Sequence, residues 1–301
     1  MNDYAKCREV SSYLTPTKAM RMGAPGKFGL LDLVFELDKD KKSIMRHWDR
    51  RAPLIVQQEL YFDEGMPEMP CVYILSAGGP NVDGDRYENR FTVRKDAYAY
   101  ISTGAATKIA EMIYNFSALK QTFVLEENAY LEYMPEQTIP CRHSRYVTDT
   151  DIEIHPSATL FYSEIYTGGR KYYGEGELFE YDLLSVCTRA HRPVFREKLV
   201  TEPQKHPVRG IGTMHHYDVF ANVIVLTPEK EAAEIYEKTK VFIDNQQRLA
   251  VGISYLPNRC GLIFKVLGME TPPVKNAIRQ FCSVVRMQVK GKPLPEEFAW
   301  R

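Results

Sequence analysis

The sequence lacks an excess of charge of either sign and lacks any long hydrophobic run. Lys plus Arg and Asp plus Glu each number 39 in 301 residues, whereas a general nucleic-acid binder needs many basic side chains facing phosphate. The longest nearly apolar run covers eight residues, 219–226, and a membrane-spanning helix needs about 20. Residues 1–18 contain no apolar segment of signal-peptide length. We therefore expect a cytoplasmic protein that binds neither nucleic acid nor a membrane.

The chain also lacks the motifs of several common enzyme classes. It contains no G-x-x-x-x-G-K-S/T phosphate loop, no G-x-G-x-x-G dinucleotide turn, no G-x-S-x-G nucleophile elbow and no H-E-x-x-H zinc helix. No two of its six cysteines lie within four residues of each other, so there is no C-x-x-C signature. We expect reduced, mostly buried thiols. The missing motifs lower the expectation of an enzyme without proving that catalysis is absent.

Two short segments contain weak candidates for metal ligands. Because adjacent strand residues point to opposite faces, His215 and His216 are poorly placed to hold one ion, and we expect one ring packed and the other solvated. Cys141 and His143 would share a face if their segment were extended, although a simply buried thiol is the alternative. The sequence therefore predicts no firm metal site.

What the chain does contain is the pattern of strands. Aromatic residues make up 12% of it, with 19 Tyr, which favours strands over helices. Alternation with period two predicts strands over residues 31–37, 87–94 and 146–154. Further β-branched and aromatic runs predict strands over residues 54–62, 72–75, 159–166, 178–186, 217–226, 250–255 and 262–267.

Helix signals are confined to the last quarter of the chain. Thr227 as a cap and Pro228 at the first helical position predict a helix over 227–241. Apolar spacings of three and four predict a second helix over 271–285. Loops are expected at 63–70 and 189–212. We predict one mainly β domain over residues 1–301 with two C-terminal helices.

A loose internal repeat suggests how these strands are arranged. Phe91-x-Val93-x-x-x-Ala97-x-Ala99 recurs from Phe123 and again from Ile152, and the repeated alanines are 32 and 29 residues apart. A repeated strand–turn–strand unit of this length is typical of stacked β-coils, that is, of a β-solenoid-like fold. Three similar hairpins in a sandwich are the alternative.

Four segments combine small, acidic and basic residues in a way that propensity alone does not explain: residues 78–85, 102–109, 131–140 and 168–175. In this order, and with the tail 291–300, they resemble the D-type urease accessory protein family, called H-type in some bacteria. The resemblance covers roughly residues 28–300, with departures at Ser102 and Gly104 and one extra residue in the first segment. The matching motif residues include Gly78, Gly79, Gly84, Lys108, Tyr133, Pro135, Gly169, Arg170 and Gly174.

The resemblance implies a coiled, β-rich scaffold for urease maturation that is not an enzyme. Members of the family bind apo-urease and the F-type accessory protein directly, and reach the nickel-carrying G-type GTPase through that complex. A two-fold assembly through the F-type partner is one arrangement it leaves open. Ni²⁺ is then a transient cargo that passes through an internal tunnel.

The resemblance also points to residues along such a nickel path. They are Asp83, Asp85, Glu88, Thr103, Thr107, Glu132 and Glu175. Oxygen donors suit weak, serial contacts with Ni²⁺, and we expect Asp85→Ala and Glu132→Ala to leave the fold intact. In the alternative reading Asp85 caps a turn and Glu88 is solvated. Lys108 and Arg170 are candidate ion-pair partners for such carboxylates.

The C-terminal helix and tail carry candidate partner-binding residues. These are Ile278, Phe281, Val285, Phe298 and Trp300, and aromatic anchors dominate interfaces. Core packing is the alternative for the helix. A function from another class is a glycoside hydrolase on a β-coil, with Asp83 and Asp85 or Glu132 as acid and nucleophile.

Overall fold

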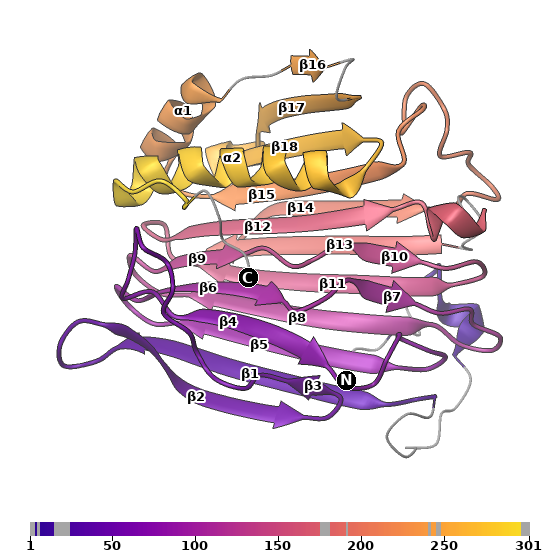
Figure 1. The fold of residues 1–301 in the computed structure, drawn as a ribbon, viewed down its shortest axis with the longest axis horizontal. Coiled ribbons are helices and arrows are strands. Elements are labelled where there is room, and N and C mark those ends of the chain that lie inside the picture. The colour runs from indigo at the N-terminus through magenta and orange to yellow at the C-terminus, as the bar shows by residue number, and fades with distance from the viewer. Residues whose placement is uncertain are drawn as a thin grey trace.

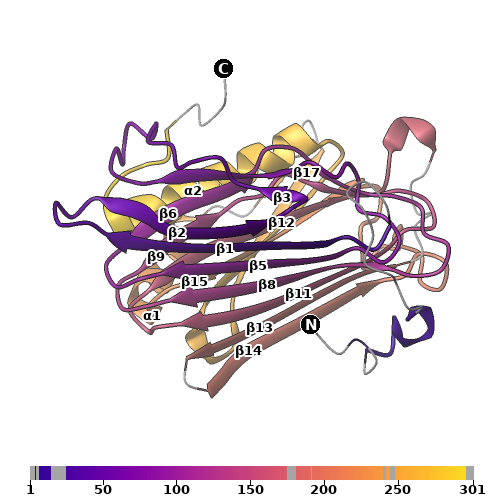
Figure 2. The same ribbon diagram turned by 90° about the horizontal axis from the view of Figure 1, so that it is seen from below.

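The computed structural model describes residue 4 and residues 7–14, 25–174, 181–190, 192–239, 242–244 and 248–295. Two sheets and two helices form three layers, with the helices on the outer face of the second sheet (Figures 1 and 2). The seven strands of the first sheet are, in spatial order, β14 (Arg192–Thr201), β13 (Tyr181–Ala190), β11 (Arg145–Ile154), β8 (Ser117–Leu125), β5 (Arg86–Val93), β1 (Phe28–Leu37) and β2 (Ser43–Arg51).

The second sheet is longer and carries the helical layer. Its strands are, in order, β16 (Phe242–Asp244), β17 (Leu249–Tyr255), β18 (Gly261–Gly268), β15 (Val219–Leu226), β12 (Thr159–Thr167), β9 (Tyr130–Tyr133), β6 (Tyr98–Thr103), β4 (Cys71–Ser76) and β3 (Leu54–Ile55). At its side lie the short parallel strands β7 (Thr107–Ile109) and β10 (Thr138–Pro140). The helices are α1 (Glu229–Lys238) and α2 (Thr271–Lys290), with 3₁₀ turns η2 (Ser11–Tyr13), η3 (Lys171–Tyr173) and η4 (Pro257–Arg259).

Between β5 and β12 the chain coils from one sheet to the other. Each coil runs through a first-sheet strand, a second-sheet strand and, in two coils, a short strand before returning, and neighbouring coils pair in parallel. The predicted repeat is in register: Phe123 pairs with Phe91 and Ile152, and Leu131 pairs with Ala99 and Leu160. The β-solenoid of about three turns is therefore confirmed over the hairpin sandwich.

Two apolar cores follow from the alternation of side chains along the second sheet. Between the sheets, Phe123 packs against Phe91, Tyr133 and Tyr162 with ring centroids 5.1–5.6 Å apart. On the other face, Phe281 of α2 stacks on Phe264 at 4.2 Å. In β6, for example, Ala99 and Ile101 lie in the core between the sheets, whereas Tyr100 lies in the core between the second sheet and α2.

Some element predictions were wrong. The strand expected over 54–62 is reduced to β3, and the loop expected over 189–212 contains all of β14. Thr227 does not cap α1; its hydroxyl lies 2.8 Å from the Thr159 hydroxyl and ties the strand end to β12. The two C-terminal helices, the loop at 63–70 and the other predicted strands are present where the structure describes them.

A polar cavity between the sheets as the candidate functional site

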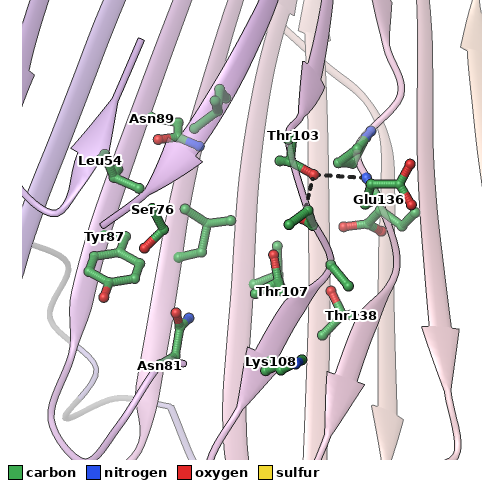
Figure 3. Close-up of a pocket in the computed structure, with 18 of the residues that line it drawn as sticks. Leu54, Ser76, Asn81, Tyr87, Asn89, Thr103, Thr107, Lys108, Glu136 and Thr138 are labelled. Atoms are coloured by element: carbon green, nitrogen blue, oxygen red, sulfur yellow. Dashed lines mark hydrogen bonds between the residues drawn. The ribbon is translucent and has the colours of Figure 1, made fainter. Parts of the chain in front are cut away.

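A cavity of about 580 Å³ lies inside the coil, where β6 and β9 lead into β7 and β10. Figure 3 shows side chains from both sheets and from the two short strands around it. The polar side chains that line it are Ser76, Asn81, Asn89, Thr103, Thr107, Lys108, Gln121, Glu136, Thr138, Thr148 and Glu164, together with several tyrosines.

The first sheet contributes two buried side-chain amides, at inward positions where its strands otherwise carry apolar residues. Asn89 and Gln121 face each other in register on β5 and β8. Gln121 accepts a hydrogen bond from the Tyr133 hydroxyl at 2.7 Å and donates to the Tyr162 hydroxyl at 3.1 Å. Asn89 is only 4% exposed, and among the described residues its Oδ1 has no hydrogen-bond partner. A buried carbonyl oxygen of this kind requires a water or a ligand.

The second sheet contributes a carboxylate to the same network. The Tyr162 hydroxyl donates a 2.6 Å hydrogen bond to Oε1 of Glu164, which is 6% exposed. Burial, together with the charge of Glu164, raises the pKa of the Tyr162 and Tyr133 hydroxyls well above their usual value. These hydroxyls therefore stay protonated at a pH where a free tyrosine ionises, at about 10 and above.

Thr103 and Thr107, two residues of the predicted nickel path, both line this cavity. Thr103 ends β6, and its hydroxyl donates to the Ala105 carbonyl at 3.1 Å and accepts from the Glu136 amide at 2.9 Å (Figure 3). The hydroxyl thereby fixes the turn into β7. The neighbouring Glu136 carboxylate lies 2.5 Å from Nζ of Lys275 on α2.

Asp85, another predicted path residue, is buried in a compensated cluster instead. Its carboxylate accepts from the amides of Lys27 and Val82, both at 2.9 Å, and lies 2.8 Å from the Lys27 ammonium. The Tyr87 hydroxyl also donates to it at 3.1 Å, and burial with this charge raises the pKa of Tyr87. Gly84, at φ 77°, gives the turn a conformation that favours glycine. Asp85 therefore caps the turn that enters β5.

Glu132 lies on the opposite face of the second sheet from the cavity. The guanidinium of Arg286 donates to both of its oxygens, at 2.7 and 2.6 Å, and also contacts Asp63. The Tyr130 hydroxyl adds a 2.5 Å hydrogen bond. Burial alone lowers the pKa of the Arg286 guanidinium, but the hydrogen bonds and charge of Glu132 raise it, so the group stays charged. The cluster joins α2 to the sheet.

The remaining path candidates are scattered. Asp83 accepts from three consecutive amides, those of Ile113, Tyr114 and Asn115, and thereby holds the loop before β8. Glu88 lies on the outward side of β5 and pairs with Arg90 at 2.6 Å. Glu175 lies outside the described residues. The structure thus gathers two of the predicted path residues in one cavity, and nickel contact by any of them stays a prediction.

The glycines of the four family motifs lie where the backbone turns tightly or approaches another residue closely. A Cβ on Gly78 would meet the Pro53 side chain at 2.9 Å. Positive φ angles occur at Gly79, Gly84, Gly169 and Gly174. Tyr133 and Pro135 line the cavity, as does the exposed Lys108. Arg170 stacks its guanidinium 4.3 Å from the centre of the Tyr173 ring.

The predicted partner-binding residues of the C-terminal helix are buried in the protein's own core. Ile278, Phe281 and Val285 are at most 2% exposed and pack between α2 and the second sheet. Core packing, the alternative, is what the structure shows for these three. Phe298 and Trp300 lie outside the described residues.

The weak metal candidates do not lie in the extended segments that the sequence suggested. His215 and His216 lie in a turn before β15, and both are exposed; their ring centroids are 4.6 Å apart, and the His216 ring lies 4.2 Å from that of Tyr217. Cys141 is buried and His143 exposed in a turn rather than an extended segment. Among the described residues no three His, Cys, Asp or Glu side chains form a group that could hold a metal ion. Cys7, Cys71, Cys141, Cys260 and Cys282 are free thiols, and the second, third and fifth of these are buried.

Comparison with known proteins decides the family. A family model described as "UreD urease accessory protein" matches residues 27–301. The chain belongs to the UreD family of urease accessory proteins. The resemblance drawn from four short segments is therefore confirmed, and the family gives this chain a role in urease maturation.

Relatives in two genera match this UreD-family chain over nearly its whole length. "Urease accessory protein UreD 2" of Brucella suis biovar 1 (strain 1330) is 44% identical over 98% of this chain and 99% of its own. "Urease accessory protein UreD" of Yersinia enterocolitica serotype O:8 / biotype 1B is 41% identical over 97% of this chain and 92% of its own. These names describe accessory proteins, and the accessory role argues against the hydrolase alternative.

The burial of its proposed carboxylates also argues against a hydrolase. Asp85 and Glu132 are both fully buried and paired with a cation, whereas a glycosidase acid and nucleophile must contact the sugar. In the part of the chain that the structure describes, no helix is both long and apolar enough to span a bilayer.

Several cavity residues were missed from the sequence, among them Asn89, Gln121, Glu136 and Glu164. A signal existed for the two amides, because each interrupts an inward apolar row, Asn89 between Tyr87 and Phe91. A polar residue at such a position needs a partner or a ligand. Glu164 interrupts β12 in the same way. Glu136 carried no local signal.

Proposed function

We propose that this protein is a non-catalytic scaffold in the cytoplasm that passes nickel to apo-urease through the cavity between the sheets. In this proposal it binds apo-urease and the F-type accessory protein directly, and the G-type GTPase delivers nickel through the complex. Ni²⁺ is a transient cargo, and no cofactor is held tightly.

The cavity carries this proposal. Its lining offers hydroxyl, amide and carboxylate oxygens from Thr103, Thr107, Asn89 and Glu164, which are donors that Ni²⁺ accepts. They come from β6, β7, β5 and β12, and therefore from both sheets and a short strand beside the second. Dispersed donors bind an ion weakly enough to release it, which conduction requires.

Filling the cavity tests the proposal. Thr107→Phe places a ring in the cavity, while Thr92→Phe, on the outward side of β5, is the matched control. We expect Thr107→Phe to abolish most urease activation at limiting nickel, because the ion path is blocked, and Thr92→Phe to preserve it. Recovery of apo-urease and the F-type protein in pull-downs is measured on the same variants. Activation that falls only in proportion to the complex recovered contradicts a nickel path.

A further inference from the structure

A second cavity of about 200 Å³ lies between the second sheet and the first turns of α2. It is lined on the helix side by Lys275, Ile278 and Arg279. It shares five lining residues with the larger cavity: Thr103, Gly104, Pro135, Glu136 and Ile165. These residues therefore form the wall at which the two cavities meet.

The charged groups at this wall form an ion pair between distant parts of the chain. Glu136 follows β9, and Lys275 lies in the second turn of α2. The Lys275 Nζ lies 2.5 Å from Oε1 of Glu136, and the side chains are 39% and 29% exposed. Partly exposed pairs of this kind contribute little net stability and exchange readily.

We infer that Glu136 is a contact for a divalent cation at this wall and that Lys275 is its built-in competitor; the inference rests on the proposed nickel passage. The ammonium occupies the carboxylate oxygens that a cation would use. A cation binds there only after the flexible Lys275 side chain moves away. The competitor keeps the cation site weak, as a relay needs.

Charge on the two sides of the wall gives the passage a direction. Lys275 and Arg279 both line the cavity under α2, and like charges repel a dication. The larger cavity has one lysine in its lining, the exposed Lys108, against the Glu164 carboxylate and the buried Oδ1 of Asn89, which has no hydrogen-bond partner among the described residues. A cation held at Glu136 is therefore directed into the coil interior.

The helix need not move for the exchange. Arg286, near the other end of α2, is fixed by Glu132 and Asp63, and all three side chains are fully buried. Lys275 has a four-carbon stem and lies about three turns from this anchor. Rotation within its side chain is enough to free Glu136.

Equilibrium dialysis of the full chain against NiSO4 tests the inference. Lys275→Met keeps most of the stem and removes the charge, so we expect Ni²⁺ to bind about two- to fivefold tighter, the range of a part-exposed ion pair. Adding Glu136→Gln to that variant should remove the gain. Lys238→Met, which removes a lysine of α1 that pairs with Glu234, is the control and should change nothing. Unchanged affinity in Lys275→Met, or a gain that persists in the double variant, overturns the inference.

Urease activation in cells separates this inference from the proposed function. If Thr107→Phe blocks activation while Lys275→Met leaves both nickel affinity and activation unchanged, nickel passage stands and the competitor is rejected. If Thr107→Phe has no effect on activation, nickel passage fails. A gain in affinity in Lys275→Met that Glu136→Gln cancels supports the competitor in either case.

Discussion

At the residue scale, buried charge occurs in compensated sets. Lys27 and Asp85 are 4% and 0% exposed in their side chains and lie 2.8 Å apart. Burying a charge without a partner is costly, whereas a pair with further hydrogen bonds is tolerated. Asp85 has such bonds from two amides and a phenol. Its role in the structure is to join the turn before β5 to Lys27.

Asp85→Ala should therefore destabilise the protein, contrary to our expectation from sequence that the fold would stay intact. The substitution removes the carboxylate that lies 2.8 Å from the buried Lys27 ammonium and accepts two amide hydrogen bonds, at a cost of about 3–5 kcal/mol. Urea denaturation followed by circular dichroism measures the loss. Glu88→Ala, which removes the ion-pair partner of the exposed Arg90, is the control and should cost less than about 1 kcal/mol. Equal midpoints for the two variants would show that Asp85 has no structural role.

The same scale shows where sequence reasoning stops. Asn89 and Gln121 can be found because they interrupt an inward alternation that the sequence displays. The Glu136–Lys275 pair cannot, since its members are 139 residues apart and meet only through the packing of α2 on the second sheet. Likewise nothing local marks Arg286 as the partner of Glu132.

At the element scale, each corner between the sheets is closed by a small residue. Ala97, Ala129 and Ala158 are at most 1% exposed and lie before β6, β9 and β12. The residues before two of these alanines, Asp96 and Asn128, have φ angles of 61° and 56°. The alanines of the sequence repeat are therefore the inner side of a repeated tight corner.

Ala129→Leu should overpack this corner. Inserting methylenes into a filled core costs about 1–3 kcal/mol, and the adjacent coils at Ala97 and Ala158 leave little room for relaxation. Thermal unfolding of Ala129→Leu, compared with Ala233→Leu on the exposed side of α1, measures the effect. A melting temperature for Ala129→Leu equal to that of the helix variant would mean that the corner has spare volume.

The two edge strands of the first sheet, β2 and β14, were not predicted. β2 carries Arg46, His47 and Asp49 on a strand with few buried residues, because it is paired on one side only. β14, the other edge of the first sheet, contains Pro193, a residue that strands accept at their edges. Both lack the alternation that marks β1 and β11. Alternation of apolar and polar residues arises where one face of a strand is buried, so it does not mark strands that bury few side chains.

At the scale of the whole molecule, the interior holds many acidic groups that are kept neutral. Burial raises the pKa of the Tyr100, Tyr130 and Tyr162 hydroxyls and of the Cys282 thiol well above their usual values. In the unfolded chain these groups titrate normally, at about pH 8.5 for Cys and about 10 for Tyr. The folded state therefore retains protons that the unfolded state loses.

The free energy of unfolding should fall as pH rises from about 9 to 11. In this range the unfolded state binds fewer protons than the native state, so the free energy of unfolding decreases as pH rises. Each group that is ionised in the unfolded chain and protonated in the folded protein contributes a decrease of about 1.4 kcal/mol per pH unit. Below the unfolded-state values this loss is absent. Urea denaturation at several pH values measures the slope, and Tyr130→Phe should make it shallower. A pH-independent stability across that range contradicts the burial of these groups.

The parallel coil also sets a length unit. Neighbouring strands of a sheet lie about 4.8 Å apart, and each coil here uses 29 to 32 residues. The separation between surfaces at β2 and at β14 can therefore change only in whole coils, each a step of about 4.8 Å. Two proteins docked at those edges would be held at a spacing that point substitutions cannot tune, so insertions or deletions in this chain should be tolerated in units of one coil.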